Sequence, residues 1–177
     1  MGARGPIDGD PVRQQPRHDS TRESQIRQAT EADLPVILEL LEECRLPTED
    51  VPAIVGSFFT AQADAIVVGV VALERFAKVG LLRSLAVPPR FRKHGIGRQL
   101  CDHVIDTART QGLADVYLLT TDADGYFNHL GFHLVERTGA PEAIGATRQF
   151  RELCPDSAKL MHRSVNRPEP KSRLSEE

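Results

Sequence analysis

The sequence predicts a single domain of the α+β (α/β) class, in which helices flank a mixed β-sheet. Runs of β-branched and other apolar residues occur at 65–73, 79–87 and 115–120, as in buried strands. Between the last two runs, apolar residues from Ile96 to Ala108 recur at helical spacing, which predicts a helix that connects two parallel strands. A chain of 177 residues is also of the right size for one domain.

The remaining elements follow from caps, periodicity and breakers. Residues 26–29 are predicted as a short strand, and Thr30 followed by Asp33 gives a helix start with an N-cap and an acid at the third position. Apolar residues at 34–41 then define one helical face. The other expected elements are a helix at 48–56, a strand at Phe58-Phe59, a helix that opens at Thr121 and closes at Gly131, a strand at 132–137 and a last strand near 157–165.

Both ends of the chain are rich in proline and polar residues and poor in large apolar side chains. Residues 1–24 and 166–177 are therefore expected to be disordered, because they bury too little apolar surface to offset the entropy lost on ordering. The folded domain is expected to span residues 25–165.

The composition argues against several classes of protein. The formal net charge is −3, so no overall positive field draws the chain to nucleic acid or to an anionic membrane. No apolar run approaches the roughly 20 residues of a membrane span, and no signal peptide is evident. Cys44, Cys101 and Cys154 are far apart, and the six histidines show no ligand spacing, so neither a disulfide framework nor a metal site is expected. We expect a cytoplasmic protein.

A basic glycine loop at 87–98 joins the end of a predicted strand to the start of the longest predicted helix. Helix N-termini offer free N–H groups, and Gly95 and Gly97 allow an anion to approach the backbone. The loop also holds four basic residues, which are Arg90, Arg92, Lys93 and Arg98. A solvated basic turn is the alternative. The loop is not a P-loop, because no Gly-Lys-Ser/Thr ends it, and Leu100 replaces the third glycine of a Rossmann fingerprint.

Two motifs together resemble the GNAT superfamily of acetyl-CoA-dependent N-acetyltransferases. The first is Arg92-x-x-Gly95-x-Gly97, preceded by Leu-Ala-Val-Pro at 85–88, and the second is Tyr-Phe-Asn-His-Leu-Gly-Phe at 126–132. The resemblance covers nearly all of residues 25–165. Finer details, at 82–87, 118–121, 130–132 and 149–155, are similar to the arsenic-resistance N-acetyltransferase-like branch.

The resemblance implies a splayed sheet, in which the strand ending at Val87 parts from the strand at 116–120. Acetyl-CoA would fill the wedge, with its pantetheine arm on main-chain groups of the first strand and its pyrophosphate on the loop amides. The resemblance places cofactor contacts at Leu85, Ala86, Val87, Arg92, Lys93, His94, Gly95, Ile96, Gly97 and Arg98. Which basic residue meets the outer phosphate of CoA stays open.

Acetylation of an amine requires a neutral amine and a proton for the leaving thiolate. Glu74, at the end of a predicted strand, is the candidate base, with an ordinary exposed glutamate as the alternative. In many superfamily members a tyrosine four residues before the glycine of the Gly-Phe pair protonates the thiolate, but here Phe127 stands there. Tyr126, about 100° around the helix, is the candidate acid, with a structural tyrosine as the alternative. Solvent or the amine's own proton is a further option.

Arginines are the candidate contacts for an acidic acceptor, since a guanidinium binds a carboxylate or another oxyanion through two hydrogen bonds. Arg75 and Arg83 lie in neighbouring predicted strands, and Arg148 lies on a loop that could close the pocket. For Arg83 the alternative is a solvent-facing arginine or an internal salt bridge, for instance to Asp115 or Glu136.

The predicted function is an acetyl-CoA-dependent acyltransferase, without a metal, that acts on the amine of a small molecule such as a toxic amino acid analogue containing arsenic or phosphorus. Acetylation of a peptide or protein amine is the first alternative. The second is a CoA-binding sensor without turnover, which Phe127 keeps open. Direct arsenic coordination by Cys154 is not expected, because no second thiol is near it in sequence. Dimers are common in the superfamily, so the resemblance makes a homodimer an option.

Overall fold

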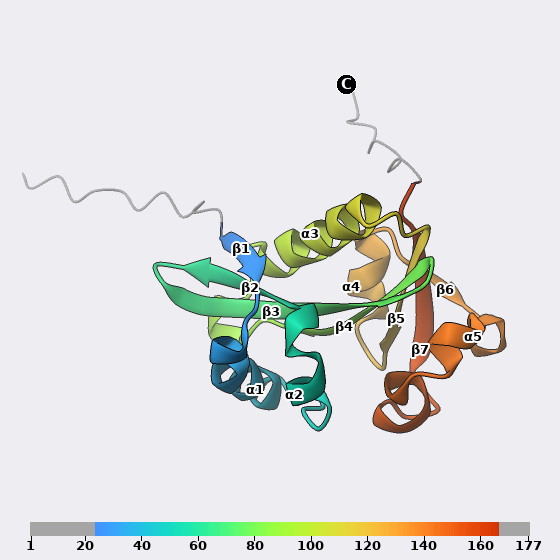
Figure 1. Cartoon of the computed structure of the whole chain (residues 1–177), viewed down its shortest axis with the longest axis horizontal. Helices are drawn as coiled ribbons and strands as arrows, with labels where there is room; N and C mark the ends of the chain where they lie inside the picture. The colour runs from blue at the N-terminus through green and yellow to red at the C-terminus, as the bar shows by residue number, and fades with distance from the viewer. Residues whose placement is uncertain (1–23, 167–177) are drawn as a thin grey trace, which may run out of the picture.

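The computed structural model describes residues 24–166, so the segments predicted to be disordered, 1–24 and 166–177, lie outside the described residues except for Ser24 and Asn166. Its centre is a seven-stranded sheet in the order β1-β2-β3-β4-β5-β7-β6 (Figure 1). Within the described residues the only parallel pair is β4 with β5, and a helix connects these two strands, as predicted. The strands are β1 (Gln25–Gln28), β2 (Phe58–Ala63), β3 (Ile66–Phe76), β4 (Val79–Ala86), β5 (Asp115–Thr120), β6 (His133–Val135) and β7 (Lys159–Ser164).

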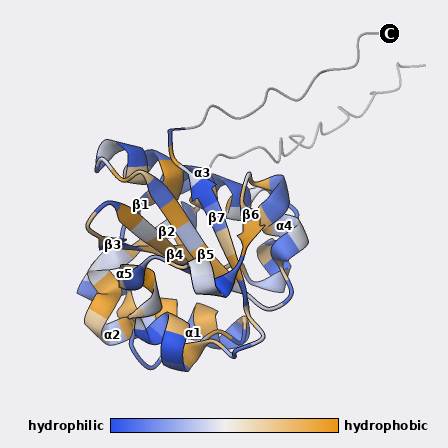
Figure 2. Ribbon diagram, turned by 90° about the vertical axis from the view of Figure 1, so that its right-hand side faces the viewer, coloured by the Kyte–Doolittle hydropathy of each residue, from blue (hydrophilic) through white to orange (hydrophobic). Residues whose placement is uncertain are grey.

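Helices cover both faces of the sheet, which confirms the predicted fold class (Figure 1). Helices α1 (Leu34–Glu43) and α2 (Val51–Ile54) lie on one face, and α3 (Ile96–Thr110) and α4 (Asp124–His129) lie on the other. Figure 2 shows hydrophobic colour along the central strands, whereas α1 and α2 carry both colours. The alternation of side chains along each strand therefore supplies two separate apolar cores.

The strands and the long helices were predicted within a few residues, but two regions differ. The helix predicted at 48–56 is shorter, because α2 gives way to a 3₁₀ turn at Val55–Ser57. Before β7, two helical segments were not predicted: α5 (Glu142–Gly145) and a π-helical turn at Gln149–Leu153. No helix among residues 24–166 is long and apolar enough to cross a membrane.

The first helical segment begins at the predicted cap. The backbone N–H of Thr30 donates to a carboxylate oxygen of Asp33 at 2.8 Å, and Arg27 donates to both oxygens of that carboxylate. Since these donors stabilise the charged form, the arginine first of all, the pKa of Asp33 lies well below its usual range. This cap links β1 to the start of α1.

The sheet opens between β4 and β5. The two strands pair from Val79 with Asp115 to Leu81 with Tyr117 and no further, while β5 remains paired with β7 to its end. On its other side β4 carries an irregularity opposite β3, at which Ser84 adopts a φ of 55°. The free edge of β4 beyond Leu81 therefore faces a gap instead of a neighbouring strand.

Candidate active site

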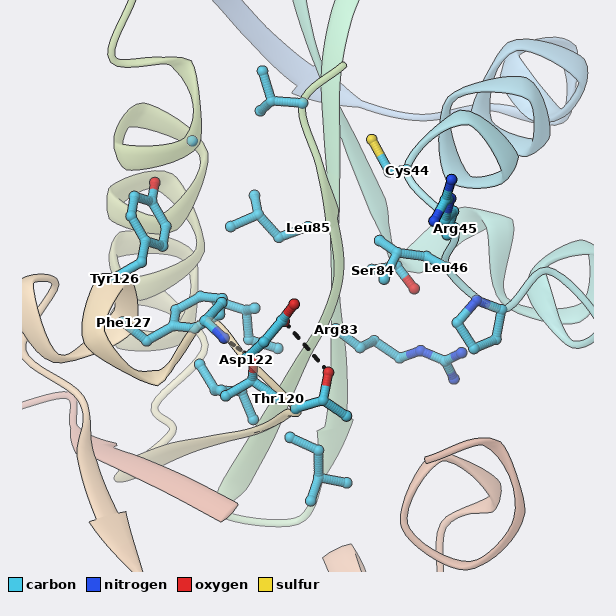
Figure 3. A pocket seen from close by; sticks show the side chains of 18 of the residues that line it. Cys44, Arg45, Leu46, Arg83, Ser84, Leu85, Thr120, Asp122, Tyr126 and Phe127 are labelled. Carbon is cyan, nitrogen blue, oxygen red and sulfur yellow. Dashed lines mark hydrogen bonds between the residues drawn. The ribbon is translucent and has the colours of Figure 1, made fainter. Parts of the chain in front are cut away.

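A pocket of about 850 Å³ occupies this gap, within the size range of small-molecule sites. Its walls come from β4, the glycine loop, the first turn of α3, the end of β5, α4 and the segment that contains the π-helical turn. Figure 3 shows Tyr126 and Phe127 on one side of β4, and Cys44, Arg45 and Leu46 on the other. We call the first side the loop end of the pocket and the second side the acceptor end.

The loop end is built to receive an anion. Gly95 is the residue before α3 and adopts a φ of 76°, a left-handed conformation that favours glycine. The N–H groups in the first turn of a helix have no carbonyl partner within the helix, and they lie at the positive end of its dipole. Lys93, two residues earlier, also has a positive φ, of 67°. The backbone of Lys93 thus adopts, at the pocket wall, a conformation that is energetically unfavourable for a residue other than glycine.

The basic residues of the loop have different surroundings. Arg90 binds the carboxylate of Glu43 on α1, with one contact of 2.6 Å, and does not line the pocket. Arg92 donates through Nε to the carbonyl oxygen of Val87 at 2.8 Å, which ties the loop to the end of β4. The Nε of Arg98 lies 3.8 Å from Asp102. Lys93 forms no ion pair within residues 24–166, so its charge is available to a ligand.

Most of the predicted cofactor residues line the pocket. They are Leu85, Val87, Arg92, Lys93, Gly95, Ile96, Gly97 and Arg98. Two do not. Ala86 is 1% exposed and packs in the core on the α1 face, while the ring of His94 lies 3.3 Å from the carbonyl oxygen of Phe91. Because the side chain of Ala86 is buried in the core, the predicted cofactor contact at this residue is limited to its main chain.

At the acceptor end, Arg83 is the centre of a buried ion cluster. Its guanidinium donates to both carboxylate oxygens of Asp50, at 2.6 and 2.8 Å, and to Glu74 at 3.0 Å. The side chain of Arg83 is only 2% exposed. The internal salt bridge considered for Arg83 therefore exists, but its partners are Asp50 and Glu74 instead of Asp115 or Glu136.

Three other predicted site residues are not on the pocket wall. Glu74 is held by Arg83 and does not line the pocket. Arg75 is exposed and follows Glu74 on β3, so it faces the opposite side of the sheet from Arg83. Arg148 is exposed and binds Glu152 at 3.0 Å.

Helix α4 presents two aromatic residues to the pocket. Phe127 is 8% exposed, and Tyr126, its neighbour, is 44% exposed. Burial of part of the ring raises the pKa of Tyr126 to about 12. The hydroxyl lies over the first turn of α3: a Cβ atom placed on Gly97 would be 2.4 Å from it. The structure therefore puts Tyr126 at the loop end of the pocket.

Several residues of the pocket wall were not predicted from the sequence. Asp122, just after β5, is the one carboxylate among the described residues that line the pocket, and Arg45 follows α1 with a φ of 57°. Gln149, on the π-helical turn, is 8% exposed and donates to the sulfur of Cys154 at 3.1 Å. The positive φ of Arg45 and the π-helical turn have no local sequence signal, and Asp122 reads as an ordinary helix-start acid.

The cysteines have separate environments. All three thiols are free; Cys44 and Cys154 line the pocket, whereas Cys101 is buried in α3. Burial raises the pKa of Cys101 to about 12, so this thiol stays protonated. Within the described residues, no group of three or more His, Cys, Asp or Glu side chains is arranged to hold a metal ion.

Comparisons with known proteins agree with this geometry. The family model for the acetyltransferase (GNAT) family matches residues 19–132. An amino-acid acetyltransferase from Neisseria meningitidis is 32% identical over 126 residues, which is 66% of this chain and 29% of the relative. The chain thus spans less than a third of the length of this relative. An uncharacterized N-acetyltransferase from Chlorobaculum tepidum is 32% identical over 51% of this chain and 58% of its own length.

Solved structures show the same fold. N-acetylglutamate synthase from Neisseria gonorrhoeae, in complex with coenzyme A and N-acetyl-glutamate, has a TM-score of 0.71 and 27% identity, covering 81% of this chain and 35% of that one. Rv2747 from Mycobacterium tuberculosis has a TM-score of 0.69 and 24% identity, covering 79% of this chain and 98% of that one. The chain belongs to the acetyltransferase (GNAT) family, as the loop and the Gly-Phe motif predicted.

Proposed function

We propose that this protein transfers the acetyl group of acetyl-CoA to the amine of a small amino acid. The observation that carries the proposal is one continuous pocket with the basic glycine loop at one end and Arg45, an arginine without an ion pair in residues 24–166, at the other. The amino-acid acetyltransferase from Neisseria meningitidis and the neighbour solved with N-acetyl-glutamate support the same substrate class.

The loop end suits an extended phosphopantetheine. The unpaired edge of β4 offers main-chain N–H and C=O groups beside Leu85 and Val87, and the first turn of α3 offers N–H groups for the pyrophosphate. Acetyl-CoA supplies the activated thioester. We assign to the backbone N–H of Val87 the hydrogen bond to the oxygen of the thioester's carbonyl group as negative charge develops there.

The acceptor end decides which amine binds. Arg83 is already matched by two carboxylates, so the cluster of Arg83, Asp50 and Glu74 carries a net charge of about −1. Arg45 lines the same end and forms no ion pair within residues 24–166. We therefore assign the acceptor's carboxylate to Arg45, and this assignment replaces the expectation that Arg83 binds it.

Asp122 is the candidate base. A carboxylate on the pocket wall can hold the ammonium group of the acceptor and accept its proton, directly or through water. Asp122 lies after β5, where the sheet opens, and in the view of Figure 3 it lies between Phe127 and Arg83. The neutral amine nitrogen then attacks the thioester carbon. A C–N bond forms, the C–S bond breaks, the nitrogen gives its extra proton to solvent, and solvent protonates the thiolate.

One assay tests the whole proposal: release of free thiol from acetyl-CoA in the presence of amino acids, arsenic- or phosphorus-containing analogues, polyamines or peptides. We expect amino acids or these analogues to accelerate release. Acceleration by peptides alone would support the peptide alternative. If CoA raises the melting temperature but no amine accelerates release, the sensor alternative replaces the enzyme. The arsenic-resistance branch and the cytoplasmic location stay predictions.

The variant Arg45→Ala should raise KM for an amino acid acceptor about tenfold, because a charged hydrogen bond contributes roughly 1.5 kcal/mol or more. KM for acetyl-CoA should not change. Steady-state kinetics with each substrate varied separately measures both values. Arg151→Ala is the control, since Arg151 is exposed and does not line the pocket. An equal loss with an amine that lacks a carboxylate would refute the assignment.

The variant Asp122→Asn should lower kcat about 100-fold, the usual range for removal of a general base, with little change in affinity for CoA. The matched control is Asp124→Asn, because Asp124 binds Lys159 at 2.8 Å and does not line the pocket. Normal kcat in Asp122→Asn together with a large loss in Glu74→Gln would return the role of base to Glu74.

A further inference from the structure

The hydroxyl of Tyr126 lies beside the first turn of α3, to which the pyrophosphate of CoA is assigned above. A Cβ atom on Gly97 would be 2.4 Å from this oxygen and 3.5 Å from the ring carbon that bears it. Gly97 is the second residue of α3, in the turn whose N–H groups have no carbonyl partner in the helix. The hydroxyl and these amides therefore face the same space.

The Tyr126 hydroxyl is a free donor. It forms no hydrogen bond within the described part of the chain, and its ring is held by an edge-to-face contact with Phe127 at a centroid distance of 5.4 Å. Because burial raises the pKa of Tyr126 to about 12, the hydroxyl keeps its proton at neutral pH.

The same geometry separates Tyr126 from the acyl transfer. Phe127 stands at the helical position from which a side chain reaches the wedge, and it is 8% exposed. Tyr126, one residue earlier, is turned about 100° toward α3. The reacting thioester has to meet the acceptor near Asp122 and Ser84, beyond Leu85, whereas the Tyr126 hydroxyl lies at the opposite end of the pocket (Figure 3).

We propose that Tyr126 is a cosubstrate-binding residue, whose hydroxyl donates a hydrogen bond to the pyrophosphate of CoA above Gly97, and that it does not protonate the thiolate. The inference requires CoA binding alone and is independent of the acceptor. Helix α4 would then contact the cosubstrate although Phe127 replaces the tyrosine found in many family members. Phe127 lines the wedge, and its neighbour Tyr126 binds the phosphates.

The test is calorimetric titration of Tyr126→Phe with CoA, with dephospho-CoA and with pantetheine, which lacks the pyrophosphate. We expect Kd to rise about tenfold for CoA and for dephospho-CoA and to stay within twofold for pantetheine. The melting temperature of the free protein should be unchanged, because the lost hydroxyl has no partner in the described residues.

An equal weakening for all three ligands, or none for CoA, would overturn the inference. A kcat loss that is as large with S-acetylpantetheine as with acetyl-CoA, together with loss of the alkaline limb of the pH profile, would return Tyr126 to the role of acid. Failure of every amine to react would refute the proposed acceptor class and leave these titrations valid. If the wild-type protein bound no CoA, the result would refute both the role of Tyr126 and the assignment of the pyrophosphate to the glycine loop.

Discussion

Replacement of Arg83 by alanine is expected to lower the free energy of unfolding by about 3–5 kcal/mol, the usual cost of breaking a buried ion pair from one side. The variant leaves two carboxylates without their cation: the side chain of Asp50 is 11% exposed and that of Glu74 is 18% exposed. Urea unfolding, followed by the midpoint at constant m-value, measures the loss.

Arg148→Ala is the matched control for this measurement. It removes an arginine from an ion pair whose side chains are 56% and 59% exposed, so the expected change is below about 0.5 kcal/mol. Arg83→Ala loses stability because two buried carboxylates are left without a cation. Removing their charges with the additional substitutions Asp50→Asn and Glu74→Gln should therefore restore part of the free energy of unfolding. A loss below about 1 kcal/mol in Arg83→Ala would mean that water reaches both carboxylates.

The ion cluster of Arg83, Asp50 and Glu74 was only partly predictable from the sequence. An arginine inside an apolar strand has to be paired or bound to a ligand, and this much was predictable from Arg83 alone. Its partner Asp50 lies 33 residues earlier, and it reaches Arg83 because α2 packs on the face of the sheet from which Arg83 projects. The separation of two residues in the sequence does not predict that they will be in contact in the folded protein.

The fold and the loop end were more accessible because their signals are local. The change of hydrophobic period along the chain predicts two parallel strands joined by a helix. The wedge between them was implied by the family resemblance, which rests on the glycine loop. The phase of α4 was predictable too: one residue of offset turns Tyr126 away from Phe127 by about 100°. What that turn brings Tyr126 against depends on how α4 packs on α3, which no pattern within α4 encodes.

Gly97→Ala is expected to weaken CoA binding by about 10- to 100-fold. The added methyl group would meet the Tyr126 hydroxyl at 2.4 Å, a distance that forces the tyrosine away from the first turn of α3. The glycine is therefore required by Tyr126, in addition to any close approach of the pyrophosphate. Titration with CoA measures the loss, and the unfolding midpoint shows whether the fold is kept.

A double-mutant cycle separates the two reasons. In Tyr126→Phe the nearest remaining ring atom is 3.5 Å from the added methyl, an ordinary contact, so Gly97→Ala should cost little more in that background. Gly95→Ala is the control: its site is open, but its φ of 76° makes alanine cost about 1–2 kcal/mol of stability, a cost that Tyr126→Phe cannot relieve. If Gly97→Ala costs the same in both backgrounds, the methyl obstructs the pyrophosphate itself, and Tyr126 is not what requires the glycine.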